Sequence, residues 1–224
     1  MRAEFRIARI FGVDIFLHWT FPALVGLLAW AWHGELGWFW SSAAAVIFIF
    51  SILFHEMAHV LAGKKLGISI NAISLFIFGG GAHLGGENFL RSYRPKAEFL
   101  MAIAGPLSSL LVAGIFYALS LAWGKPLEPV FSLLFILSII IAIFNMLPLF
   151  PMDGGRILRC VLCAITKNLA KATKIALVVT MILGALLFIL SFAFLGIFSG
   201  IWIGSIVFMV ISMARAEYRA VQVL

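Results

Sequence analysis

Charged residues are scarce in this sequence of 224 residues. Asp, Glu, Lys and Arg make up 11% of the chain, whereas hydrophobic residues make up 64%. A soluble globular domain is about 25% charged, so this composition excludes a soluble protein and predicts an integral membrane protein. The length leaves room for several membrane spans and little else, and we expect residues 1–224 to form a single domain.

Cysteine is also rare, with only Cys160 and Cys163 in the chain. A Cys-x-x-Cys pair can serve redox chemistry or bind zinc. Here no second pair and no βαβ pattern accompanies it, and the surrounding residues indicate a continuous helix. We therefore expect no functional role for the two thiols.

The chain contains five long apolar runs, and about 20 such residues are enough to cross a membrane. The last run has no charged residue over 40 positions and would be about 60 Å long as one helix, twice the thickness of a bilayer core. We expect it to fold back within Leu195–Gly200, which gives about six spans. Glycines at four-residue spacing, Gly196, Gly200 and Gly204, favour close helix packing within the bundle or between protomers of an oligomer. The runs are residues 15–32, 38–62, 98–123, 129–152 and 175–214.

The basic residues are distributed unevenly among the connecting segments. Fifteen of the sixteen Lys and Arg residues fall at the termini and in the two longer loops of one side, and only Lys125 falls on the other. Basic loops remain in the cytoplasm, so we expect a multi-pass protein of the cell membrane with both termini cytoplasmic. Because topology accounts for the positive charge, we expect no nucleic-acid partner. The leader contains Glu4 and Asp14 and is long for a signal peptide, so the first span is expected to be retained.

Residues 68–88 interrupt the series of spans. They are glycine-rich and too short to cross a membrane, and their β-branched and aromatic residues predict a strand or hairpin between spans 2 and 3. The edge of such a strand, formed by Ile73–Phe78, can hold an extended peptide by main-chain hydrogen bonds. The three glycines that follow, Gly79, Gly80 and Gly81, would let that peptide approach closely. The alternative is that the segment only caps the bundle.

Two of the nine acidic residues, Glu56 and Asp153, lie within or at the inner end of apolar helices, and the other seven lie in loops or at span ends. Glu56 belongs to the sequence HExxH, between His55 and His59. On a helix, positions i and i+4 share a face, so both imidazoles can bind one zinc ion while Glu56 serves as general base toward a water molecule. A shared cation explains why these groups are tolerated in a span.

Two histidines leave a catalytic zinc one ligand short, because such sites usually have three protein ligands. Asp153 is the remaining intramembrane carboxylate, and it follows Pro148 and Pro151. Prolines break a helix, so we expect a broken helix in span 4 that turns Asp153 inward and leaves Asn145 polar near the metal. The alternative is a simple helix stop at the membrane edge.

At this point a family resemblance is clear. HExxH in span 2, together with Asn145-x-x-Pro148-x-x-Pro151-x-Asp153-Gly154 in span 4, resembles the site-2 protease family of intramembrane zinc metalloproteases. The sequence AGP at 104–106 and RIFGVDIFLHWTF near the N-terminus are similar to its prokaryotic and archaeal members, so the likeness covers nearly the whole chain. The chain contains neither the CBS pair nor the PDZ domain that many members carry.

The resemblance implies an all-α polytopic membrane protein with a small β element between spans 2 and 3. It implies a zinc metalloendopeptidase that cuts membrane-tethered protein substrates near the cytoplasmic side of the bilayer. His55, His59 and Asp153 would hold one zinc ion with a bound water or hydroxide, and Glu56 would be the catalytic base. Asn145 would help to hold the substrate or the developing oxyanion.

Three other hypotheses fit the residues less well. A divalent-metal transporter needs a path to both faces, whereas the four site residues lie toward one end of their spans. A membrane metalloprotease of the prenyl-protein type completes its zinc site with a distant glutamate, which the spans here lack. An inactive scaffold is disfavoured because every expected ligand and the base are intact.

Overall fold

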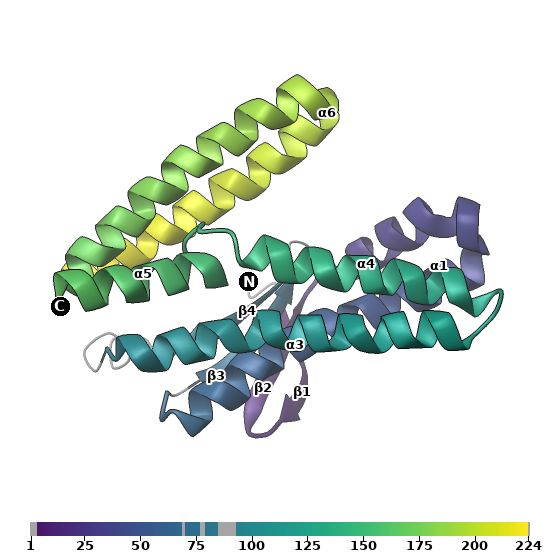
Figure 1. Cartoon of the computed structure of the whole chain (residues 1–224), viewed down its shortest axis with the longest axis horizontal. Coiled ribbons are helices and arrows are strands. Elements are labelled where there is room, and N and C mark those ends of the chain that lie inside the picture. Colours follow the sequence, from purple (N-terminus) through teal and green to yellow (C-terminus); the bar gives the residue numbers. More distant parts are fainter. Residues whose placement is uncertain (1–3, 69, 77–78, 85–92, 224) are drawn as a thin grey trace. The chain divides into compact units, whose positions relative to one another are not determined.

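A computed structural model describes residues 4–68, 70–76, 79–84 and 93–223 of the chain. It divides into two compact units, one formed by residues 1–85 and 104–144 and the other by residues 86–103 and 145–224. The helices are α1 (Phe21–Lys65), α3 (Pro95–Ala122), α4 (Leu127–Asn145), α5 (Asp153–Thr166) and α6 (Leu169–Gln222) (Figure 1). The strands are β1 (Glu4–Ile10), β2 (Val13–His18), β3 (Ile70–Phe76) and β4 (Gly79–Leu84).

The first unit contains a four-stranded sheet in the order β1-β2-β3-β4. β2 pairs with β3 in parallel, and the other two pairs are antiparallel. One face is apolar and buried, with Ile15 opposite Ile73 in the register. On β2 the preceding residue, Asp14, faces the other way, because successive side chains on a strand alternate between faces. Asp14 pairs with Arg6 at 3.3 Å.

The predicted β element is therefore present and most of the chain is helical, as predicted, but the sheet has two further strands near the N-terminus. Residues 4–18, interpreted as a leader and the start of the first span, form β1 and β2. The predicted strand at Ile73–Phe78 begins earlier, at Ile70, and residues 77–78 lie outside the described part of the chain.

A helical core completes the first unit. Buried side chains from three helices, Ala44 of α1, Phe116 of α3, and Val130 and Leu134 of α4, form its centre. Within α1, Gly37 has a non-helical backbone with φ 73° and ψ 161°, so the 45-residue element is two helical segments. A positive φ of this kind is readily adopted only by glycine.

The second unit is built around α6, which folds back on itself. Its backbone leaves the helical conformation at Gly196, where φ is 83°, inside the segment where the sequence predicts a break. A Cβ added at Gly200 would lie 2.6 Å from the ring of Phe192, and one at Gly204 would lie 2.6 Å from the ring of Phe188. The two halves therefore pack closely as an antiparallel pair (Figure 1), and the glycine spacing serves contacts within the chain.

Four of the described helices, α1, α3, α4 and α6, are long and apolar enough to cross a membrane. The expected span at residues 129–152 ends as a helix at Asn145. Pro148 and Pro151 lie in the link between α4 and α5, so the predicted proline break is present.

Candidate metal centre

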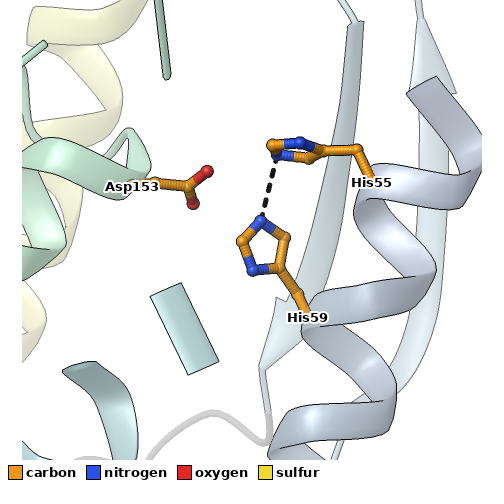
Figure 2. A group of neighbouring side chains, drawn as sticks. All are labelled: His55, His59 and Asp153. Carbon is orange, nitrogen blue, oxygen red and sulfur yellow. Dashed lines mark hydrogen bonds between the residues drawn. The ribbon is translucent and has the colours of Figure 1, made fainter. Parts of the chain in front are cut away.

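Two imidazoles face each other on α1. His55 and His59 are one helical turn apart and are only 3% and 7% exposed, and their Nε2 atoms are 3.1 Å apart (Figure 2). The zinc-to-nitrogen distance is about 2.0–2.1 Å, so two nitrogens on one tetrahedral ion lie about 3.3 Å apart. The observed separation of the Nε2 pair fits this geometry.

A serine of α3 holds the far side of His55. Ser109 is buried, and its Oγ lies 2.9 Å from Nδ1 of His55. When Nδ1 donates its hydrogen to this hydroxyl, Nε2 keeps the lone pair that a metal needs. A hydrogen bond of this kind fixes the tautomer and the orientation of a metal-binding histidine.

Helix α3 packs directly against the Nε2 pair because residue 105 is glycine. A Cβ at Gly105 would lie 2.2 Å from Nε2 of His59 and 2.7 Å from Nε2 of His55, far closer than non-bonded atoms approach. Any larger residue would push against both imidazoles. The buried imidazoles and the distance between their Nε2 atoms fit a divalent transition metal.

The remaining predicted residues lie on α1, α4 and α5. Glu56 follows His55 on α1 and is buried. Asp153 is the first residue of α5 and is also buried, in a position where the partial positive charge of a helix N-terminus stabilises a carboxylate. Asn145 is the last residue of α4 and is half-buried.

The two glycines after Asp153 have a steric role. A Cβ at Gly154 would lie 2.2 Å from the carbonyl oxygen of Met146, and one at Gly155 would lie 2.3 Å from the backbone nitrogen of Phe150. The first turn of α5 therefore packs directly on the link that precedes it. The absence of a side chain at both positions is what allows this close contact.

The predicted glycine segment opens β4, an outer strand of the described sheet. Gly79, Gly80 and Gly81 are paired in register with Phe76, Leu75 and Ser74 of β3. Only one side of β4 is occupied by β3 in the described residues, so the other side is an edge.

The cysteine pair shows no sign of reactivity. Both thiols are free and lie on α5. Burial, together with the negative charge of Glu98, raises the pKa of Cys160 to about 12. A thiol with this pKa stays protonated at neutral pH and is a poor nucleophile.

Sequence reasoning missed two residues at the histidine pair. Ser109 carried no signal, and Gly105 was noted only as part of AGP. The one signal available was Gly105 within AGP, a small residue in a short motif. Its role depends on which side chains it packs against, and the sequence does not show them.

Known proteins resemble this chain over most of its length. The sequence profile of peptidase family M50 matches residues 43–127 and 120–190. Rip3 of Mycobacterium tuberculosis is 29% identical over 240 residues, which cover 97% of this chain and 59% of Rip3. Zinc metalloprotease MJ0392 of Methanocaldococcus jannaschii is 31% identical over 178 residues, which cover 79% of this chain and 50% of that protein.

The structure agrees with these sequence matches. The site-2 protease from Methanocaldococcus jannaschii aligns with a TM-score of 0.70 and 28% identity, covering 96% of this chain and 95% of that one. The chain spans about half to three-fifths of the length of the two curated relatives. The HExxH histidines lie inside the matched segment, and the chain belongs to peptidase family M50.

Proposed function

We propose that this chain is an intramembrane zinc metalloprotease in which His55, His59 and Asp153 hold the zinc ion. The observation that carries the proposal is the buried Nε2 pair, whose atoms lie 3.1 Å apart, with α3 packed against it at Gly105. Asp153 is the buried carboxylate that supplies the third ligand. Family membership supports hydrolysis and gives no support to the metal-transporter or prenyl-protein alternatives.

The chemistry divides between the metal and the protein. Zinc in such a site supplies Lewis acidity toward a water molecule and a carbonyl group. Glu56 takes a proton from the attacking water and passes it to the leaving amine, as a buried carboxylate beside the ligand histidine is placed to do. Asn145 holds the substrate backbone or the developing oxyanion by hydrogen bonds from its side-chain amide.

The proposed setting is the cell membrane, with six spans and both termini in the cytoplasm. The breaks at Gly37 and Gly196 divide α1 and α6 into two passes each, and α3 and α4 supply one each. The basic residues of the connecting segments support a cytoplasmic side for both termini. The two compact units then act as one protease domain.

Metal analysis of purified protein tests the ligand set. We expect about one zinc per chain, and loss of most of it in Asp153→Ala, because two ligands bind zinc far more weakly than three. Glu35→Ala, which removes an exposed carboxylate of α1, is the control and should keep its zinc. Cleavage of a single-span substrate should stop with a chelator and return with added zinc. Active protein without a transition metal would contradict the proposal.

The substrate of this site is a membrane-tethered protein, and we propose that its unwound segment is held against the open edge of β4. Successive N–H groups of a strand point to opposite edges. Of the two residues Gly80 and Gly81, one therefore directs its N–H toward β3 and the other directs its N–H toward the open edge. Proline at either position removes that N–H. We expect the open-edge variant to lose cleavage by about tenfold or more, the effect of about one strong hydrogen bond, with zinc content unchanged.

The opposite side of the sheet offers a control for this experiment. Ile7 lies in β1 at an irregularity, where it has no Cα partner in β2, so Ile7→Pro should leave cleavage at the wild-type rate. If both glycine variants also cleave normally, the substrate is held elsewhere, and the link beside Asn145 is the next segment to test.

A further inference from the structure

The link between α4 and α5 is held by contacts that converge on Phe150. This residue is fully buried and packs with Ala176, Leu177 and Ala214 of α6. Asp153 follows three positions later, as the first residue of α5. Whatever fixes Phe150 therefore also fixes the backbone that leads into Asp153.

Thr180 of α6 binds the backbone of Phe150. Its Oγ1 accepts a hydrogen bond from the Phe150 N–H at 2.7 Å and donates one to the carbonyl oxygen of Ala176 at 2.8 Å. Thr180 is fully buried, so no water replaces this partner. The link contains two prolines and is not a regular helix. The Thr180 hydroxyl of α6 therefore supplies the hydrogen bond that a helical carbonyl group would otherwise give the Phe150 N–H.

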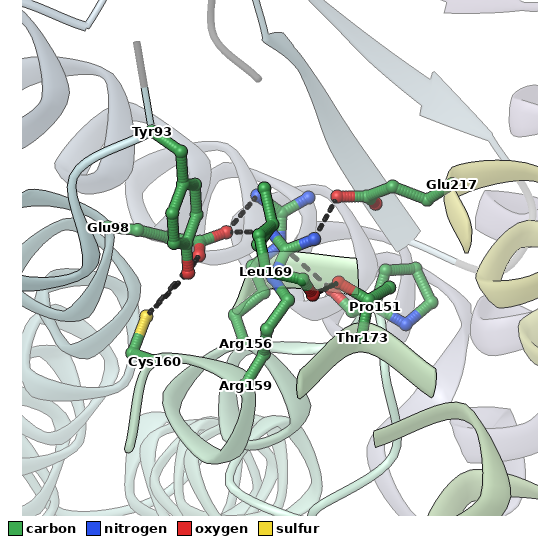
Figure 3. A network of polar contacts seen from close by, with 9 residues as sticks. All are labelled: Tyr93, Glu98, Pro151, Arg156, Arg159, Cys160, Leu169, Thr173 and Glu217. Carbon is green, nitrogen blue, oxygen red and sulfur yellow. Dashed lines mark hydrogen bonds and ion pairs between the residues drawn. The ribbon is translucent and has the colours of Figure 1, made fainter. Parts of the chain in front are cut away.

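Arg159 of α5 covers the ring of Phe150. Its guanidinium carbon lies 4.5 Å from the ring centroid, a stacking distance for a cation on an aromatic face. The guanidinium pairs with Glu98 of α3 and, at 2.7 Å, with Glu217 of α6 (Figure 3). Two carboxylates on different helices therefore hold a fully buried charge in place.

Further contacts tie the link to the first turn of α5. Arg156 donates from Nε to the carbonyl oxygen of Pro151 at 2.9 Å. The backbone N–H of Met152 bonds the carbonyl oxygen of Leu149 at 2.8 Å. With the close packing of Gly155 on Phe150, the link and the helix start form one packed piece.

We propose that Phe150, Thr180 and Arg159 form a clamp that sets the position of Asp153 as a zinc ligand. Thr180 and Arg159 are then positioning residues of the metal site, although neither is a ligand. The inference rests on the proposed function, in which Asp153 binds the metal. Small displacements of a ligand weaken a metal site strongly, so the clamp determines zinc affinity and the symmetry of the ligand field.

The test compares Thr180→Val, which removes the hydroxyl at nearly constant volume, with Thr180→Ser, which keeps it. Zinc affinity is measured on the full chain in detergent by competition with a chelating dye, and the visible spectrum is recorded on cobalt-substituted protein. We expect Thr180→Val to weaken zinc binding about 10- to 100-fold and to change the cobalt bands. Thr180→Ser should stay within about threefold of wild type.

Ser191→Ala is the matched control. Ser191 is a buried residue of the same helix, and its hydroxyl donates a hydrogen bond within that helix, to the carbonyl oxygen of Phe188. This variant should keep the wild-type affinity and cobalt spectrum. A merely structural role for Thr180 would make the two variants alike.

Arg159→Lys gives a second measurement in case Thr180→Val does not fold. Lysine keeps the positive charge but loses the planar stacking on Phe150 and the fork that pairs with two carboxylates. We expect the same weakening of zinc affinity and the same spectral change. If Asp153→Asn loses zinc while the clamp variants keep wild-type affinity and spectrum, the clamp is wrong and the proposed function stands. If Asp153→Asn keeps its zinc, the proposed ligand set fails and the clamp fails with it.

Discussion

Glu56→Gln is expected to stop cleavage while zinc stays bound. Glutamine has the shape of glutamate but cannot accept a proton from the attacking water, and loss of a general base lowers rates by about 10²- to 10⁴-fold. Zinc content should remain near one equivalent, because His55 and His59 are untouched. The rate is measured on a gel-resolved single-span substrate, and the metal by elemental analysis of the same preparation.

A matched change separates this effect from the loss of any carboxylate. Glu35→Gln alters an exposed glutamate of the same helix and should cleave at the wild-type rate. Proteolysis retained in Glu56→Gln would end the assignment of Glu56 as the base. Loss of zinc in that variant would instead make Glu56 part of the ligand set.

Gly105→Ala is expected to remove zinc and, with it, all activity. The added Cβ would lie 2.2 Å from Nε2 of His59 and 2.7 Å from Nε2 of His55. Either the imidazoles turn away or α3 shifts, and in both cases the two nitrogens no longer share an ion. We expect a fall in zinc affinity larger than the 10- to 100-fold typical of losing an orienting partner, measured by chelator competition.

Gly114→Ala controls for a methyl group on the same helix. A Cβ at Gly114 meets no atom within 4 Å, and alanine stabilises a helix by up to about 1 kcal/mol relative to glycine. This variant should bind zinc normally and melt at the same or a slightly higher temperature. If Gly105→Ala binds a full equivalent of zinc, the close packing of α3 at Gly105 does not hold the two imidazoles in the metal-binding arrangement.

Features that depend on neighbouring positions in the chain were predictable from sequence. The facing pair His55 and His59 follows from helical periodicity, and the break at Gly196 follows from a run too long for one bilayer. The link after Asn145 follows from two prolines. In each case a local rule determines the outcome whatever the rest of the chain does.

Features that depend on distant partners were not predictable. Ser109 bonds a histidine 54 positions away, and β2 pairs with a strand that begins at Ile70. Glu98 was placed at a span end, and it does lie in the first turn of α3. It is nevertheless fully buried, because Arg159, 61 positions later, neutralises it. No periodicity in the sequence reveals such pairings, since they are created by the packing of whole elements.

The parallel pairing of β2 with β3 also restricts how the ribosome-bound chain can enter the membrane. Hydrogen-bonded neighbours such as Ile15 and Ile73 cannot be separated by a bilayer, so the chain leaving β2 and the chain entering β3 must be on one face. We therefore expect the 45 residues of α1 between them to cross an even number of times. The β1–β2 hairpin is synthesised first, but β3 can pair with it only after α1 has been synthesised.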